Sequence, residues 1–186
     1  MTTQQKGLAV LAIQVALVLS IGVKYAWERH HCPMVWAKAN QFDPSQPLRG
    51  RYLAISLQAS ACGLPASQEI EGSFPVQRRG RIVQTFGAQQ WRVVPAVRNG
   101  QLAPRVVDET RPGPTQQLIL SNETPCDEAV LAGTSDFFIP EHAKSPFPLQ
   151  KGQELWALVT VPPSGPVRPV KLAVSDSSGW HVLNLD

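Results

Sequence analysis

The stretch FDPSQPLRGRYLAISLQASAC, residues 42–62, marks the change between two kinds of sequence. Residues 42–47 hold two prolines and an aspartate, which is typical of turns. A basic corner follows with Gly50 at its centre, where a residue without a side chain permits a tight change of direction. The alternation from Tyr52 to Leu57 predicts a strand that ends near Cys62. We therefore expect this stretch to connect an amino-terminal segment to a β-rich domain.

The amino-terminal segment contains a long apolar run. Gly7 to Val23 reads GLAVLAIQVALVLSIGV and carries no charge. A helix of about 20 apolar residues, with roughly 17 as the lower limit, spans a bilayer. The apolar core of a cleaved signal peptide is shorter, at about 7 to 15 residues, and Ala37-Lys38-Ala39 lies too far away for ordinary cleavage. We expect an uncleaved signal-anchor in a single-pass membrane protein, with a cleaved signal peptide as the alternative.

Residues beyond the apolar run are expected to extend the helix. The extension covers Tyr25 to Asn40, and Pro33 should end or bend it after Cys32. His30, His31 and Cys32 are of metal-ligand types. Adjacent residues on a helix point in different directions, so we expect a polar collar here and no metal site.

The orientation of the chain in the membrane depends on opposing signals. Lys6 precedes the apolar run, whereas Lys24, Arg29 and Lys38 follow it, and a simple count places the carboxyl side in the cytoplasm. Long domains can cross regardless of this count. The cysteines and the family resemblance described below favour export. We therefore expect a bacterial inner-membrane protein whose carboxyl-terminal domain is extracytoplasmic, or periplasmic.

The rest of the chain predicts short strands separated by turns. The chain has 186 residues and 17 prolines, and this proline content argues against a helical bundle. The expected strands are 52–57, 81–86, 90–97, 101–107, 117–120, 137–140, 154–161, 167–174 and 180–185. We expect a mainly β fold, in which an N-terminal transmembrane helix precedes a compact antiparallel β sandwich or barrel-like domain. The anchor and juxtamembrane helix would occupy residues 1–41, and the exported domain residues 42–186.

Two local features refine this prediction. Asn99-Gly100 is the clearest two-residue hairpin turn in the chain, although Pro95 weakens the end of the strand before it. Gly63 to Arg79 is rich in Gly, Pro, Ser and charge, and is expected to form a loop with a short helical turn at Ala66 to Ile70.

Cys62 and Cys126 each lie beside the end of an expected strand. A disulfide between them would close a loop of about 60 residues and contribute about 3–4 kcal/mol to stability. Such a bond requires an oxidising compartment and would leave Cys32 as the odd thiol. The alternative is three unpaired thiols in a cytoplasmic domain, and the sequence leaves both open.

The sequence GRYLAISL, which begins at Gly50, resembles the motif that names the GDYXXLXY family of bacterial membrane-anchored proteins. Gly50 and Tyr52 match the motif, and Ile55 stands in place of its leucine. Arg51 replaces the aspartate of the motif, and Leu57 replaces its last tyrosine.

Two more stretches support the resemblance. Residues 137–141, FFIPE, are similar to the aromatic-aliphatic-Pro-Glu signature of the family, and 156–161 with 167–174 are similar to its closing pair of strands. The resemblance implies an anchored extracytoplasmic domain whose biochemical role is not established, and it supplies no catalytic residues. Because Arg51 stands where the family has an acid, a site built on that carboxylate is not carried over.

The two motif stretches are expected to meet. Glu141 follows an apolar run and would pair with an arginine of the basic corner. The pairing could serve as a polar site, but we favour a salt bridge that pins the two stretches together. The residues expected in this polar cluster are Arg49, Gly50, Arg51, Tyr52, Pro140 and Glu141.

The net charge and the motifs of the chain argue against two classes of function, nucleic-acid binding and serine hydrolysis. The net charge is only +3 and the tight basic cluster at residues 78–81 is short, so we expect no nucleic-acid binding. A Ser-His-Asp site would need His142 or His181, and no Gly-x-Ser-x-Gly elbow is present. We predict no catalytic residue, metal or cofactor.

The favoured function is an envelope interaction or scaffold module, held in the membrane by residues 7–23 and bound to another envelope protein. The alternative is an envelope hydrolase with a site near Arg49, Glu141 and His142.

Overall fold

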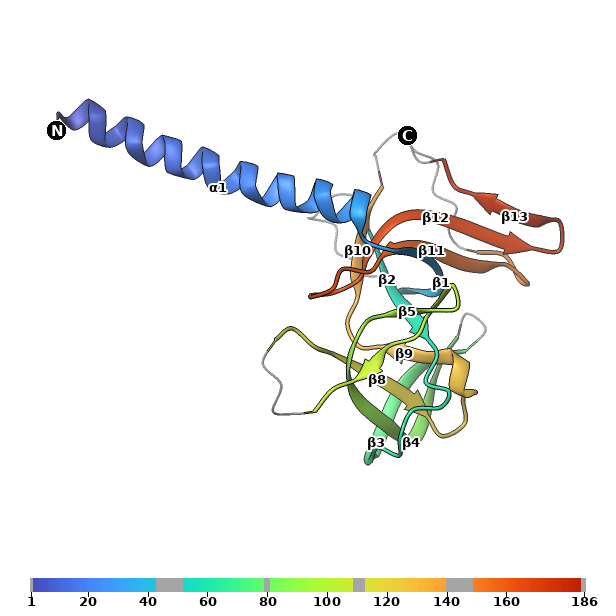
Figure 1. Ribbon diagram of the computed structural model, residues 1–186. Coiled ribbons are helices and arrows are strands. Elements are labelled where there is room, and N and C mark those ends of the chain that lie inside the picture. Colours follow the sequence, from blue (N-terminus) through green and yellow to red (C-terminus); the bar gives the residue numbers. More distant parts are fainter. Residues whose placement is uncertain (1, 43–51, 79–80, 109–112, 140–148, 185–186) are drawn as a thin grey trace. The chain divides into compact units, whose positions relative to one another are not determined.

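The computed structural model describes residues 2–42, 52–78, 81–108, 113–139 and 149–184 (Figure 1). The chain divides into two compact units, Met1–Cys32 and Pro33–Asp186. The first unit is one apolar helix, and the second is an antiparallel, sandwich-like arrangement of strands. The mainly β fold class is therefore confirmed. The second unit begins at Pro33, ahead of the boundary at residue 42 that the sequence suggested.

Helix α1 (Thr3–His31) has defined caps at both ends. The Thr2 side chain accepts a hydrogen bond from the Gln5 backbone N–H, and the Gln5 side chain accepts one from the Thr2 backbone in return. This reciprocal capping box satisfies amides that a helix start leaves unpaired. At the other end, Cys32 adopts an extended conformation directly before Pro33. The helix therefore ends where the proline was expected to end it.

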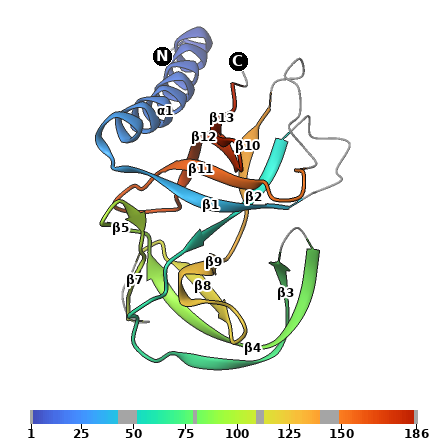
Figure 2. The same ribbon diagram turned by 90° about the vertical axis from the view of Figure 1, so that its right-hand side faces the viewer.

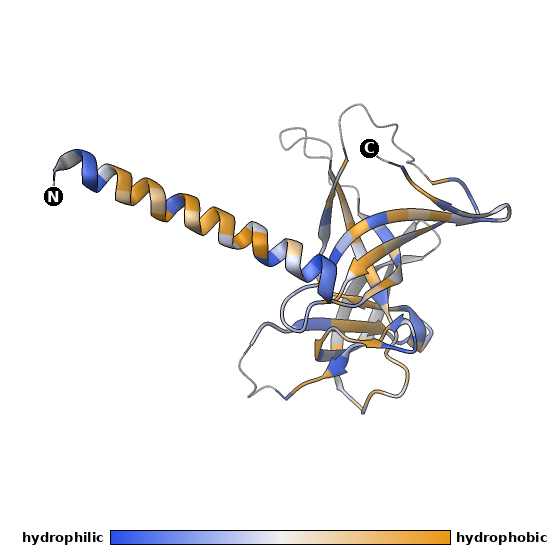
Figure 3. Ribbon diagram, turned by 45° about the horizontal axis from the view of Figure 1, so that its top comes forward, coloured by the Kyte–Doolittle hydropathy of each residue, from blue (hydrophilic) through white to orange (hydrophobic). Residues whose placement is uncertain are grey.

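The apolar part of α1 suits a membrane. Gln4–His31 is long and apolar enough to cross a bilayer, with a mean hydropathy of 2.1 over its most apolar stretch (Figure 3). A signal sequence near an N-terminus meets the same description. The prediction of helix as far as Asn40 is wrong, because residues Met34–Phe42 form strand β1. Val35, Ala37 and Ala39 alternate into the core there, which is the pattern of a strand.

The strands of the domain join in one continuous order, β13-β12-β11-β1-β2-β9-β8-β4-β3. In addition, β10 pairs with β2 and β7 pairs with β4, and every one of these pairings is antiparallel. The bounds that follow β1 are β2 (Tyr52–Ala59), β3 (Gln68–Arg78), β4 (Arg81–Val94), β7 (Arg105–Val106), β8 (Gln116–Ser121), β9 (Ala129–Leu131), β10 (Ser135–Phe138), β11 (Glu154–Thr160), β12 (Arg168–Asp176) and β13 (Gly179–Val182).

Strand β2 joins the two halves of this arrangement (Figure 2). Its first residues pair with β10, and Leu57 pairs with Ala39 of β1. At its far end, Ala59 pairs with Ala129 of β9. A single strand therefore belongs to both layers, and the stretch that the sequence singled out lies at the centre of the domain.

The core lies on one face of these strands. In the β1–β11 pair, Val35 lies opposite Val159 and Ala37 opposite Ala157, and all four side chains are buried. The period of two in a strand sends the alternate residues to the outer face. The core is completed mainly by Leu53, Ile55, Leu57, Trp91, Val93, Leu118, Leu131, Leu155, Leu172 and Val174.

The predicted hairpin at Asn99-Gly100 is confirmed. Both residues have positive φ, 52° and 73°, as a two-residue hairpin turn requires. Its strands, β5 (Val97–Arg98) and β6 (Gln101–Leu102), are only two residues long. Pro95 and Pro104 lie just outside them and cannot donate ladder hydrogen bonds.

Other expected strands are also present, as β2, β8, β10, β11, β12 and β13. The loop expected over residues 63–79 is confirmed only for residues 63–67, because β3 begins at Gln68 and pairs along β4. The helical turn expected at Ala66 to Ile70 is wrong. Strand β4 also runs unbroken through both expected strands, 81–86 and 90–97, as far as Val94. Strand β9 and the short 3-10 helix η1 (Cys126–Glu128) lie between the expected strands 117–120 and 137–140, where the sequence predicted no element.

Candidate functional site

The predicted polar cluster falls mostly outside the described residues. Of its residues, Arg49, Gly50, Arg51, Pro140 and Glu141 lie outside the described ranges, as does His142 of the alternative hydrolase site. The two motif stretches nevertheless meet through their strands, because Tyr52 pairs with Phe138 and Leu53 with Phe137. Ile139, which follows β10, is buried in the core. The salt bridge between the stretches stays a prediction.

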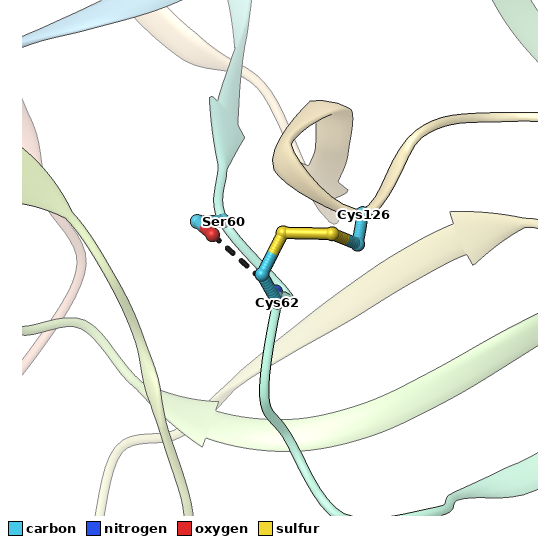
Figure 4. Close-up of a disulfide and its surroundings, with 3 residues drawn as sticks. All are labelled: Ser60, Cys62 and Cys126. Carbon is cyan, nitrogen blue, oxygen red and sulfur yellow. Dashed lines mark hydrogen bonds between the residues drawn. A yellow bond between two sulfur atoms is a disulfide. The ribbon is translucent and has the colours of Figure 1, made fainter.

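Cys62 and Cys126 form a disulfide, with S–S 1.94 Å and Cα–Cα 4.9 Å (Figure 4). It ties the chain just beyond β2 to η1, across a sequence separation of 64. Backbone hydrogen bonds support the same junction: the Ala61 N–H donates to the Cys126 carbonyl at 2.7 Å, and the Cys62 N–H donates to Ser60 Oγ at 3.3 Å. Cys32 is a free thiol.

Asp176, Ser178 and His181 form a polar cluster at the turn between β12 and β13. Asp176 Oδ1 accepts hydrogen bonds from the Ser178 backbone N–H at 2.8 Å and from Ser178 Oγ at 2.6 Å. Ser178 Oγ also lies 2.9 Å from His181 Nε2. The hydrogen bond from the Ser178 side chain is the main cause that lowers the pKa of Asp176 to about 2. The Ser178 N–H, Gln153 and the charge of His181 act in the same direction.

This cluster holds the three residue types of a hydrolase triad, but not the geometry. In a triad, the acid holds one ring nitrogen of the histidine while the other receives the serine proton. Here Asp176 Oδ1 lies 3.6 Å from the same Nε2 that contacts Ser178. The serine hydrogen points to the carboxylate, so the histidine is not placed to remove it. The arrangement stabilises the hairpin turn and does not activate a nucleophile.

A second candidate for chemistry is a hollow of about 130 Å³. Its described lining is Val94, Arg105, Gly113, Pro114, Thr115, Pro163 and Ser164. This lining brings together no histidine and no acid, which general acid-base chemistry would need. Among the described residues, no group of three or more His, Cys, Asp or Glu side chains is placed to hold a metal ion.

The outer face of the sheet carries a tryptophan cluster, which we define as Trp36, Trp156 and Trp180. The Trp36 and Trp180 rings meet edge to face with centroids 5.1 Å apart. Trp156 lies 5.3 Å from Trp180 in a tilted arrangement. Because Val35 and Leu155 point into the core, their neighbours in β1 and β11 must point outward. The tryptophans therefore gather on the face that the core does not use.

The tryptophan cluster is partly open to solvent. Trp180 is 43% exposed. Met34 and Val182 lie two residues from Trp36 and Trp180 on the same face of β1 and β13, and they are 49% and 52% exposed. The Trp156 Nε1–H is buried and has no hydrogen-bond partner in the part of the chain that the structure describes. Such an apolar face with an exposed indole at its centre is typical of contact surfaces.

Charged side chains border the cluster. Lys38 lies opposite Trp156 in the β1–β11 ladder, and its Nζ is 2.8 Å from Glu154 Oε1 and 3.8 Å from Glu128 Oε1. This surface does not follow from the helix expected over residues 34–40, because the side chains of a helix do not alternate between two faces. The alternation of Met34, Trp36 and Lys38 with small apolar residues is the signal in the sequence that indicates a strand here. Its two faces differ, one turned toward solvent and one toward the core.

No protein-family model, curated protein or solved structure matches this chain. The resemblance to the GDYXXLXY family therefore stays a prediction.

Proposed function

We propose that the protein is a single-pass bacterial inner-membrane protein whose domain, Pro33–Asp186, acts outside the cytoplasm as an envelope interaction module. The length and apolar character of α1 support the anchor. The Cys62–Cys126 disulfide supports export, since such bonds persist in oxidising compartments. The GDYXXLXY-like stretches support the same location.

The exposed tryptophan cluster is the observation that carries the interaction role. Tryptophan is enriched among the residues that dominate binding energy, because a large ring loses much water-exposed area on contact. Trp180 has free area to lose, and its neighbours Trp36 and Trp156 hold it in place. Lys38, Glu154 and Glu128 supply a polar border, as expected around an apolar contact.

The alternative, an envelope hydrolase near Arg49, Glu141 and His142, receives no support from the described residues. The Asp176 cluster lacks triad geometry, and the hollow near Arg105 has no acid or histidine in its described lining.

Two experiments test the proposal. Reporter fusions after residue 186 should be active only with a reporter that works outside the cytoplasm, and a cytoplasmic result would overturn the location. For the interaction, a photo-reactive amino acid at position 180 should give a protein adduct of defined mass in intact cells, whereas the same group at exposed Gln101 should not. Adducts with lipid alone, or equal adducts at both positions, would contradict a protein-binding role for the tryptophan cluster.

A further inference from the structure

We infer that α1 pairs with α1 of a second copy of this chain through a face centred on Gln14. The inference rests on the proposed function in one respect, because α1 must remain in the membrane.

Gln14 lies in the middle of the uncharged run from Gly7 to Val23, so a spanning helix places it near the bilayer midplane. Its carboxamide has two N–H donors and an acceptor oxygen. No hydrogen bond joins this group to any described residue, and its surroundings on α1 are exposed. Ser20, the other polar residue of the run, already donates to the Leu17 carbonyl at 2.7 Å. The Gln14 carboxamide therefore has unsatisfied hydrogen-bonding groups in the hydrocarbon, where no water is available to bond them.

The residues around Gln14 form a helix-pairing seam. Gly7, Gln14 and Ile21 repeat at intervals of seven, which places them in line along one side of the helix. Val10, Leu11, Leu17 and Val18 fill the positions between them, and these four side chains are 55% to 70% exposed. No atom lies within 4 Å of a Cβ built on Gly7, so a second backbone can approach there.

A second copy is the occupant that fits this seam. In a parallel pair related by a two-fold axis, the two Gln14 side chains stand at the same depth and can donate to each other. The apolar residues above and below then pack against their own equivalents. One polar residue in an otherwise apolar seam also fixes register, as a single buried amide does in soluble coiled coils. A helix from another protein would need a polar group at the same depth.

The test uses the full-length protein in vesicles of phosphatidylethanolamine and phosphatidylglycerol. Copies labelled at the N-terminus with donor and acceptor dyes report pairing by energy transfer as lipid is added. Gln14→Leu should weaken the pairing roughly 3- to 30-fold, the range that corresponds to measured interhelical hydrogen bonds. Gln14→Asn should keep most of the pairing. Ser20→Leu is the matched control, since it also removes a polar side chain from the span but lies on another side of the helix, and it should change nothing.

The outcomes separate this inference from the proposed anchor. If alkaline carbonate releases the protein from cell membranes, or if mass spectrometry shows that the mature chain lacks residues 1–31, the anchor is wrong and the inference falls with it. If the protein is integral and intact but Gln14→Leu pairs as well as the wild type, the inference alone is wrong. Two other results would overturn the inference: no energy transfer between copies of the wild type, or a loss of energy transfer in Ser20→Leu as large as that in Gln14→Leu.

Discussion

The rings of Trp36 and Trp180 are in edge-to-face contact, although one belongs to the first strand of the domain and the other to the last. Strands β11 and β12 lie between those two strands in the sheet, so the contact reaches over them. Such ring pairs contribute about 0.5–1.5 kcal/mol beyond the area that they bury. The contact thus links the two ends of the domain sequence while leaving part of Trp180 open.

Two substitutions at Trp156 distinguish the contribution of the aromatic ring to stability from that of the indole N–H. Trp156→Phe keeps an aromatic ring and removes a buried donor that has no partner among the described residues. We expect the free energy of unfolding to change by less than about 1 kcal/mol, because no hydrogen bond is lost. Trp156→Ala should cost about 3 kcal/mol through lost packing. Urea unfolding of the detergent-solubilised chain measures both, and equal losses would show that the N–H is bonded.

Removing the disulfide should loosen the domain. The double variant Cys62→Ser, Cys126→Ser frees a loop with a sequence separation of 64. We expect a loss of about 3–4 kcal/mol, because the unfolded chain regains the entropy that the cross-link removed. Cys32→Ser is the control, since Cys32 is not cross-linked, and its unfolding midpoint should match the wild type under non-reducing conditions. A double variant as stable as this control would contradict the expectation.

The turn at Asp176 should make stability depend on pH. The folded-state pKa is lowered to about 2, chiefly by the Ser178 hydroxyl, from an unfolded value of about 3.9. A lowered pKa stabilises the fold above pH 4 or so, and this contribution disappears as the pH falls toward 2. Asp176→Asn lacks the charge, so it should melt below the wild type at pH 7 and together with it near pH 2. A difference that persists unchanged at pH 2 would contradict the role of the carboxylate.

The ion pair of Lys38 and Glu154 should be measurable but weak. Its Nζ–Oε1 distance is 2.8 Å, and the two side chains are 30% and 45% exposed. A double-mutant cycle with Lys38→Met and Glu154→Gln should give a coupling energy of about 0.5–1 kcal/mol, because solvent screens exposed charges. Raising the salt concentration to 1 M should reduce the coupling further. Coupling that is insensitive to salt would point to packing of the lysine stem instead.

Local patterns in the sequence were sufficient for much of the fold. The positive φ angles at Asn99 and Gly100 follow from residue type, and alternation predicted strands such as β2 and β11. Strand β1 was not predicted because Ala37, Lys38 and Ala39 also suit a helix. Its strand conformation depends on pairing with β11 and, from Ala39 onward, with β2. Strand β3 likewise depends on its partner β4.

The candidate site was harder to predict than the fold. The tryptophan cluster joins residues from three strands that are remote in sequence, so no local pattern contains it. The cluster at Asp176 depends on the orientation of a serine hydroxyl within one turn. The two motif stretches were expected to meet through Glu141 and an arginine, and they do lie side by side, since Tyr52 pairs with Phe138 in the sheet. The charged side chains of that expected pair lie outside the described residues.

The short connection between α1 and β1 has a mechanical consequence. Only Cys32 and Pro33 separate the helix from β1, which pairs with β11 from Met34 to Ala39 and with β2 from Ala39 to Phe42. The Pro33 carbonyl accepts a further bond from the Val161 N–H at 2.9 Å. A pull on α1 therefore enters the domain through a strand that lies inside the sheet. Drawn lengthwise, β1 shears its bonds to β11 and, beyond Ala39, its bonds to β2, so both ladders must give way before the strand leaves the sheet. The domain should therefore resist tension applied through α1 better than tension applied to an edge strand such as β13, which has β12 as its one neighbour in the sheet order.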